Sequence, residues 1–194
     1  MKTARLPAFR PAADTSKLRL RLCQARKTEN VILRPTCAAP PLNFEYENVK
    51  QTLLESGVSN ALIYVNEYLF ATEHAINLKL DGNIDIEHIM RKSGINREHI
   101  MHDIGVDDPD EFREYAEKLG NKILLESEIN RGIGDAWFRT KKENHISKGN
   151  GYIGSKFPIA QSLVTYTKDT WTKEDIDLAT EKAAKRIADF VFEL

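Results

Sequence analysis

The sequence predicts an α+β domain that is mostly helical and is built around one small strand–strand–helix unit. Residues 84–87 alternate isoleucine with an acidic residue, which is typical of a half-buried strand. Residues 123–125 form a second apolar run of strand length. From Thr172 onward, apolar residues recur at helical spacing behind a capping threonine and early acids. These patterns indicate a short hairpin surrounded by helices.

Composition limits the class of protein. A chain of 194 residues suits one domain, or one domain with an extension. The formal net charge of −1 gives no general attraction to nucleic acid, so DNA would have to contact a local basic patch. Cys23 and Cys37 lie outside the candidate site, which argues against a disulfide framework and a cysteine-ligated zinc. Without a long apolar run, we expect a cytoplasmic protein that does not enter a membrane.

The first 45 residues carry the weakest structural signal. Five prolines interrupt them, and we expect an N-terminal extension over residues 1–45 followed by the main domain over residues 46–194. Residues 18–22 alternate leucine with arginine and residues 31–33 are apolar. These two runs fit either a hairpin or a basic, poorly ordered arm.

The main domain shows helix and turn signals in order. Helical spacing predicts a helix over residues 44–56 and a second one capped by Ser59. The second helix is expected to turn one apolar face inward, formed by Leu62, Val65, Tyr68, Leu69 and Ile76. A later helix is predicted over residues 135–145, with Trp137 and Phe138 turned inward. Asp81-Gly82-Asn83 indicates a turn into the first strand.

Later signals surround the second strand. Asp108 followed by Pro109 marks a helix start, and Gly120 is expected to stop that helix. Ser127 would cap the helix after the second strand, which places Asn130 in its first turn.

Four residues along this unit suit phosphodiester hydrolysis. Hydrolysis needs a base to deprotonate water and a cation to stabilise charge on the phosphate. His88 suits the base because its ordinary pKa lies near neutral pH, and the Asn121 amide could hold its ring in one orientation. Glu87 and Asn130 would supply oxygen ligands to a metal. Asp85, on the same strand face as Glu87, could take the role of Glu87.

The order of these residues resembles the site of HNH, or His-Me finger, nucleases. The wider stretch is similar to the C-terminal HNH domain of GmrSD-type restriction nucleases, whose motifs read IEHI, LGN, a later Asn, F-x-x-K and Y-x-x-S. The matching residues here are Ile86-Glu87-His88-Ile89, Leu119-Gly120-Asn121, Asn130, Phe138 with Lys141, and Tyr152 with Ser155. Arg91 and Lys122 depart from the family pattern, which usually has proline and leucine there.

The resemblance implies a ββα-metal nuclease core, Mg²⁺ or Mn²⁺ as cofactor, and DNA as substrate in defence against phage. It also implies a separate NTP-binding sensor protein or domain, because relatives usually carry one. A basic stretch follows the second strand, and we expect DNA to contact Arg131, Arg139, Lys141 and Lys142. Tyr152 and Ser155 would either approach a phosphate or pin their loop.

Two other classes of function stay open. The chain could keep the fold as a nucleic-acid-binding or regulatory module without catalysis, which the unusual Arg91 and Lys122 favour. It could also be an RNase toxin that uses the same site.

Overall fold

A two-stranded antiparallel sheet carries the centre of the predicted site. Strand β1 (Ile84–His88) pairs with β2 (Lys122–Glu126), with Ile84 opposite Glu126 and His88 opposite Lys122. Helix α6 (Ser127–Ile133) follows β2 directly and packs on both strands. The predicted strand–strand–helix order is therefore confirmed.

The computed structural model describes residues 45–55, 57–92, 97–143 and 151–194. These residues belong to one compact unit, Asn43–Leu194. The expected hairpin or arm within residues 1–45 lies outside the described residues, as does part of the predicted helix 135–145.

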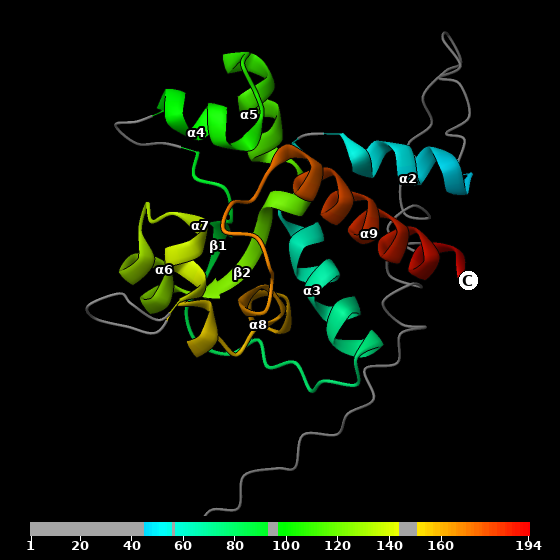
Figure 1. Cartoon of the computed structure of the whole chain (residues 1–194). Coiled ribbons are helices and arrows are strands. Elements are labelled where there is room, and N and C mark those ends of the chain that lie inside the picture. Colours follow the sequence, from blue (N-terminus) through cyan, green and yellow to red (C-terminus); the bar gives the residue numbers. More distant parts are fainter. Residues whose placement is uncertain (1–44, 56, 93–96, 144–150) are drawn as a thin grey trace, which may run out of the picture. The chain divides into compact units, whose positions relative to one another are not determined.

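Helices pack on both sides of the sheet (Figure 1). In Figure 1, α9 runs beside α2 and α3, and it also contacts the turn that leads into β2. Helices α3 and α8 cover β2. The remaining described helices are α2 (Tyr46–Leu54), α3 (Ala61–Glu73), α4 (Arg97–Ile104), α5 (Pro109–Glu117), η1 (Leu119–Asn121), α7 (Phe138–Lys142), η2 (Tyr152–Gly154), α8 (Pro158–Val164) and α9 (Lys173–Phe192).

Local capping signals explain where two of these helices begin. Asp108 caps α5 by accepting a hydrogen bond from the Asp110 N–H at 2.7 Å, and Pro109 is its first helical residue. Thr172 and Asp175 form a reciprocal capping box at the start of α9. These sequence predictions are confirmed.

Gly120 has a different role from the predicted helix stop. Helix α5 already ends at Glu117, and Gly120 lies inside the short helix η1. A Cβ at this position would lie 2.3 Å from the Ile176 carbonyl oxygen and 2.4 Å from the Thr180 backbone nitrogen of α9. Glycine is therefore required because the two backbones approach each other this closely.

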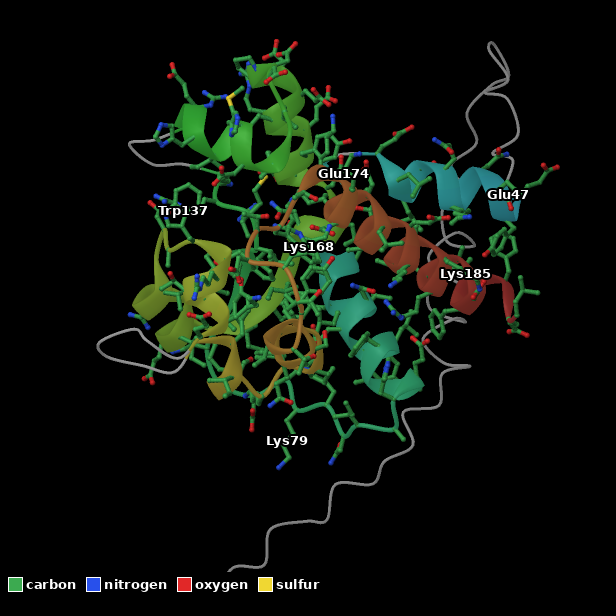
Figure 2. The ribbon with its side chains drawn as sticks, in the orientation of Figure 1. Glu47, Lys79, Trp137, Lys168, Glu174 and Lys185 are labelled. Atoms are coloured by element: carbon green, nitrogen blue, oxygen red, sulfur yellow. The ribbon has the colours of Figure 1, made fainter. Side chains whose placement is uncertain are left out.

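Three local predictions are wrong in detail. Tyr68 and Ile76 are 42% and 45% exposed, and α3 instead buries two polar side chains, Asn66 and Glu67. Trp137 does not turn inward: it is 38% exposed, and Figure 2 labels it at the start of α7. Ser127 is the first residue of α6 and not its cap. Tertiary contacts, which helical spacing does not report, decide each of these orientations.

The buried core joins the sheet to the helices. Ile123, Leu124 and Leu125 of β2 are at most 2% exposed, so both faces of β2 are covered. Around them lie apolar side chains from most helices, including Ile63, Phe112, Phe138, Leu163, Ile176 and Ile187. Among the described helices, none is both long enough and apolar enough to span a membrane.

Candidate functional site

One polar cluster lies where β1 meets the first turn of α6. Because Ile84 pairs with Glu126 at the end of the sheet, α6 begins beside the start of β1. Asp85 accepts a hydrogen bond from the Ser127 hydroxyl at 2.8 Å and another from the Asn130 side-chain amide at 3.2 Å. These hydrogen bonds lower the pKa of Asp85, so its side chain is a carboxylate at neutral pH. Asn130 therefore contacts Asp85, the alternative ligand.

Glu87 belongs to a second, buried cluster. It is 6% exposed, and its carboxylate accepts hydrogen bonds from Lys141 and, at 3.2 Å, from the Tyr152 hydroxyl. The Lys141 ammonium also donates to the carbonyl oxygens of His88 and Ile89, at 2.7 and 3.3 Å. Burial raises the pKa of Glu87, and the Lys141 ammonium opposes this rise. Glu87 therefore contacts Lys141 and not Asn130, and metal binding by Glu87 stays a prediction that requires opening this ion pair.

His88 faces a third cluster at the end of α5. Its Nε2 atom lies 3.7 Å from a carboxylate oxygen of Glu117 and has no hydrogen-bond partner among the described residues. Glu117 is held by the ammonium groups of Lys122, at 2.5 Å, and Lys92, at 3.3 Å. Burial lowers the pKa of His88 to about 4, and the charge of Lys92 acts in the same direction. The imidazole is therefore neutral at pH 7, as a general base must be.

Asn121 holds the backbone next to His88 and does not hold its ring. The completely buried Asn121 accepts a hydrogen bond from the Met90 N–H at 2.7 Å. Its amide nitrogen donates to the carbonyl oxygens of Ala116, at 3.1 Å, and Met90, at 3.5 Å. The predicted contact between Asn121 and the His88 ring is absent. Asn121 instead joins the chain after β1 to the end of α5, which positions His88 indirectly.

The three clusters are divided between the two faces of the sheet. Side chains alternate along a strand, so Asp85 and Glu87 share one face of β1 and His88 turns to the other. The contacts agree, because Asp85 meets α6 while His88 meets Glu117 of α5. The four predicted catalytic and metal-binding residues are thus not gathered around one pocket.

Most of the predicted DNA contacts are buried inside the domain. Four of the six residues are at most 6% exposed, namely Lys141, Lys142, Tyr152 and Ser155. Lys142 donates to the backbone carbonyl oxygens of Tyr166 and Lys168, and Ser155 donates to Glu126 at 2.8 Å. A side chain enclosed in this way cannot reach a phosphate. In this structure these four side chains instead connect neighbouring segments of the domain by hydrogen bonds.

Arg131 and Arg139 are the exposed members of the predicted DNA-binding set. Arg131 lines an open depression together with Asn83, Asp85 and Ser127. Its Nε atom donates to the Ser127 carbonyl oxygen at 3.0 Å, which leaves the rest of the guanidinium group available. Arg139 pairs with Glu143 at 2.9 Å. Of the two, Arg131 lies beside the Asp85 cluster.

Sequence reasoning missed the residues that surround His88. Nothing in the local pattern separates Glu117 from the other acids of α5, because its proximity to His88 depends on how α5 packs against the sheet. Asp85 had a local signal, since it shares a strand face with Glu87.

One pair of side chains in the described part of the chain suits a metal ion. Within residues 45–55, 57–92, 97–143 and 151–194, no three His, Cys, Asp or Glu side chains gather to hold an ion. Asp85 with Asn130 nevertheless offers two side chains with hard oxygen atoms, the type of ligand that Mg²⁺ prefers. Magnesium commonly takes only one or two protein ligands, with water and phosphate completing its shell, so this pair fits the ion.

Comparison with known proteins identifies the family. The family described as "GmrSD restriction endonucleases, C-terminal domain" matches residues 42–186. No curated protein and no solved structure gave a significant match. The match covers the sheet, all three polar clusters and most of α9. The chain therefore belongs to the family of C-terminal domains of GmrSD restriction endonucleases.

Proposed function

We propose that the chain is a metal-dependent DNA endonuclease or nickase of the HNH type that acts in restriction. The observation that carries this proposal is membership of a restriction endonuclease family over residues 42–186. The strand–strand–helix unit supports it by bringing one carboxylate and one amide together at the start of α6.

The proposed metal ligands are Asp85 and Asn130, with Glu87 as the ligand first suggested by the sequence. The carboxylate oxygen of Asp85 lies 3.2 Å from the Asn130 amide nitrogen. Rotating that amide by half a turn would put its oxygen in the same place. Two neighbouring ligands of an octahedral Mg²⁺ with bonds of about 2.1 Å are about 3.0 Å apart. The separation therefore suits a shared ion with little movement.

A bound Mg²⁺ or Mn²⁺ would stabilise negative charge on the phosphate and the departing oxygen. Neutral His88 would accept a proton from the attacking water. Asp85 lies three residues before His88 on β1 and on the opposite face of the strand. At a rise of about 3.3 Å per residue, the two residues are about 10 Å apart along the strand. Joint action on one phosphate therefore requires the end of β1 to move towards α6 when DNA binds. Asn121, which holds Met90, would be the positioning residue at that end of the strand.

DNA would reach the Asp85 cluster across the depression that Arg131 lines. An exposed guanidinium beside the metal ligands could contact a phosphate neighbouring the one that is cut. Recognition of the target would come from a separate NTP-binding sensor protein or domain.

A non-catalytic module is the second candidate, and one observation favours it. In the described part of the chain, five polar residues of the family motifs make hydrogen bonds inside the domain. They are Glu87, Asn121, Lys141, Tyr152 and Ser155. The motifs would then maintain a fold, and DNA binding through Arg131 would be the activity.

A plasmid-nicking assay separates the two candidates. With Mg²⁺ or Mn²⁺, the wild-type chain should convert supercoiled DNA to the nicked form, and a chelator should stop the reaction. His88→Ala should lose activity by at least about 100-fold, the usual contribution of a general base. Glu98→Ala, an acid to alanine change on the exposed side of α4, should leave the activity unchanged.

The same assay with RNA in place of DNA tests whether the substrate is DNA. Wild-type protein that binds DNA but nicks it no faster than a protein-free control would establish the non-catalytic module, and undiminished nicking by His88→Ala would refute His88 as the base. Each variant must first match the wild-type circular dichroism spectrum, so that loss of activity is not loss of fold.

A further inference from the structure

An apolar cleft lies on the helical side of the domain, away from the Asp85 cluster. Helices α3, α8 and α9 form its walls, and residues at the start of β2 form its floor. In Figure 1, α3 and α8 lie beside β2, and α9 lies beside α3. The apolar lining includes Phe70, Ile159, Leu163, Trp171, Leu178 and Ala179. The proposed nuclease function uses none of these residues.

The cleft is large enough for a two-ring organic group. Its volume is about 210 Å³. An apolar cavity of about 150 Å³ is enough to hold benzene, and one water occupies about 30 Å³. Leu178, which also lines the cleft, is 49% exposed, so much of its apolar side chain is in contact with water. A ligand that covered Leu178 would remove apolar surface from water.

Trp171 carries a hydrogen-bond donor that no acceptor in the described part of the chain satisfies. The side chain is 6% exposed, and its indole N–H is buried without a partner among the described residues. An unpaired buried N–H is costly to a fold, and such groups are rare in native proteins. Trp171 lines the cleft, and a small shift of its ring would let an oxygen or nitrogen acceptor of a bound ligand take this N–H.

Among the residues that the structure describes, one positive charge at the cleft has no ion-pair partner. The other charged residues of the lining each have an ion-pair partner: Lys122 with Glu117, Arg186 with Glu73, and Asp175 with Lys168. Lys182 lines the cleft on the exposed side of α9 and makes no ion pair with the residues that the structure describes. The charge complementary to the cleft is therefore a single negative charge.

We propose that this cleft binds a small, flat, apolar monoanion, such as an aromatic carboxylate. Its rings would lie between α3, α8 and α9 and cover Leu178. Its anionic group would face the Lys182 ammonium, and an acceptor atom would take the Trp171 indole N–H. This binding site is independent of the nuclease proposal, because none of its determinants takes part in the proposed chemistry.

Titration calorimetry with 1-naphthoate tests the site. The full chain should bind one equivalent saturably. The uncharged analogue 1-naphthamide, which keeps the rings, should bind about fivefold more weakly, since it loses one partly exposed ion pair. In ¹⁵N-labelled protein, naphthoate should shift the indole N–H resonance of Trp171. The resonance of Trp137, the second tryptophan of the chain, should stay in place and serves as an internal control.

Two pairs of variants assign the binding to the cleft. Ala179→Phe fills it and should abolish binding, whereas Val191→Phe adds the same ring to an exposed position of α9 and should not. Lys182→Gln should weaken naphthoate about fivefold without affecting naphthamide, whereas Lys185→Gln should change neither. Figure 2 labels Lys185 on α9.

Absence of saturable heat at millimolar naphthoate would overturn the proposal. So would binding that Ala179→Phe leaves intact, or a shift confined to Trp137, because either result places the ligand elsewhere. Lys182→Gln keeps the test decisive if Ala179→Phe does not fold, since Lys182 is exposed and its change removes no core contact.

Discussion

The carboxylate of Asp85 lies 3.2 Å from the side-chain amide of Asn130, across the junction between β1 and α6. Glu87, two residues further along the same strand face, is instead 6% exposed and paired with Lys141. The two acids of β1 thus have different tasks, although their local sequence is nearly the same.

Exchanging each acid for its amide should separate metal binding from stability. Asp85→Asn should weaken Mn²⁺ binding at least about tenfold, because it removes the only charged ligand of the proposed pair. Glu87→Gln should leave Mn²⁺ affinity within about twofold and should lower stability. Water-proton relaxation enhancement measures Mn²⁺ affinity directly, without any cleavage assay. The opposite pattern would restore Glu87 as the ligand.

Breaking the Glu87–Lys141 pair from one side should be strongly destabilising. Lys141→Met leaves a buried carboxylate without its partner, so the free energy of unfolding should fall by about 3–5 kcal/mol. The double variant Glu87→Gln with Lys141→Met carries no buried charge and should lose less than Lys141→Met alone. Urea denaturation measures both.

The exposed pair formed by Lys185 and Asp189 is the control for that experiment. Lys185→Met removes the same kind of charge from an exposed i,i+4 pair, where water solvates the remaining carboxylate. It should scarcely move the urea midpoint. Equal losses at the two sites would mean that burial does not govern the Glu87–Lys141 pair.

Gly120 should tolerate no side chain. In Gly120→Ala the new methyl group would meet backbone atoms of α9 at 2.3 and 2.4 Å, and backbone cannot give way as a flexible side chain can. We expect a loss of at least about 2 kcal/mol, the scale of overpacking in a core. Thermal unfolding followed by circular dichroism measures it.

Gly132 provides the matched comparison for Gly120. It lies within α6, and a Cβ there would meet nothing within 4 Å. Gly132→Ala should stabilise the chain by about 0.5 kcal/mol through the better helix propensity of alanine. Similar effects of the two substitutions would contradict the close approach of η1 and α9.

Glu67 should make stability depend on pH. The side chain is fully buried; one carboxylate oxygen accepts the Ile159 N–H at 3.0 Å and the other has no partner among the described residues. Burial raises its pKa from 4.5 to about 7, so the folded chain holds this proton more tightly than the unfolded chain does. The stabilising contribution of the protonated Glu67 carboxyl to the free energy of unfolding is therefore complete below pH 4.5 and is lost as pH rises through 7.

Between pH 4.5 and pH 8, ionisation of Glu67 should lower the free energy of unfolding by about 3 kcal/mol, at about 1.4 kcal/mol per pKa unit. Glu67→Gln keeps the acceptor for Ile159 and cannot ionise. The difference in unfolding free energy between this variant and the wild type should grow in favour of the variant from pH 5 to pH 8. A difference that stays constant over that range would show that Glu67 does not titrate there.

Local sequence was sufficient to locate the elements that carry the candidate site. Alternation predicted β1, and the caps at Asp108 and Thr172 mark the starts of α5 and α9. Each signal depends on residues within one or two turns of each other, so it can be recognised without knowledge of the fold.

Partner choice required the tertiary structure. Lys141 was predicted at a DNA surface, yet it is 1% exposed and neutralises Glu87, 54 residues away in sequence. Asn121 was expected at the His88 ring but holds the Met90 backbone. The sequence by itself determined the order of strands and helices and the family motifs, because those depend on neighbouring residues. Which carboxylate meets Asn130, which lysine is buried and what faces His88 were decided only by packing, because a buried charge takes its partner from whichever distant segment the fold brings against it.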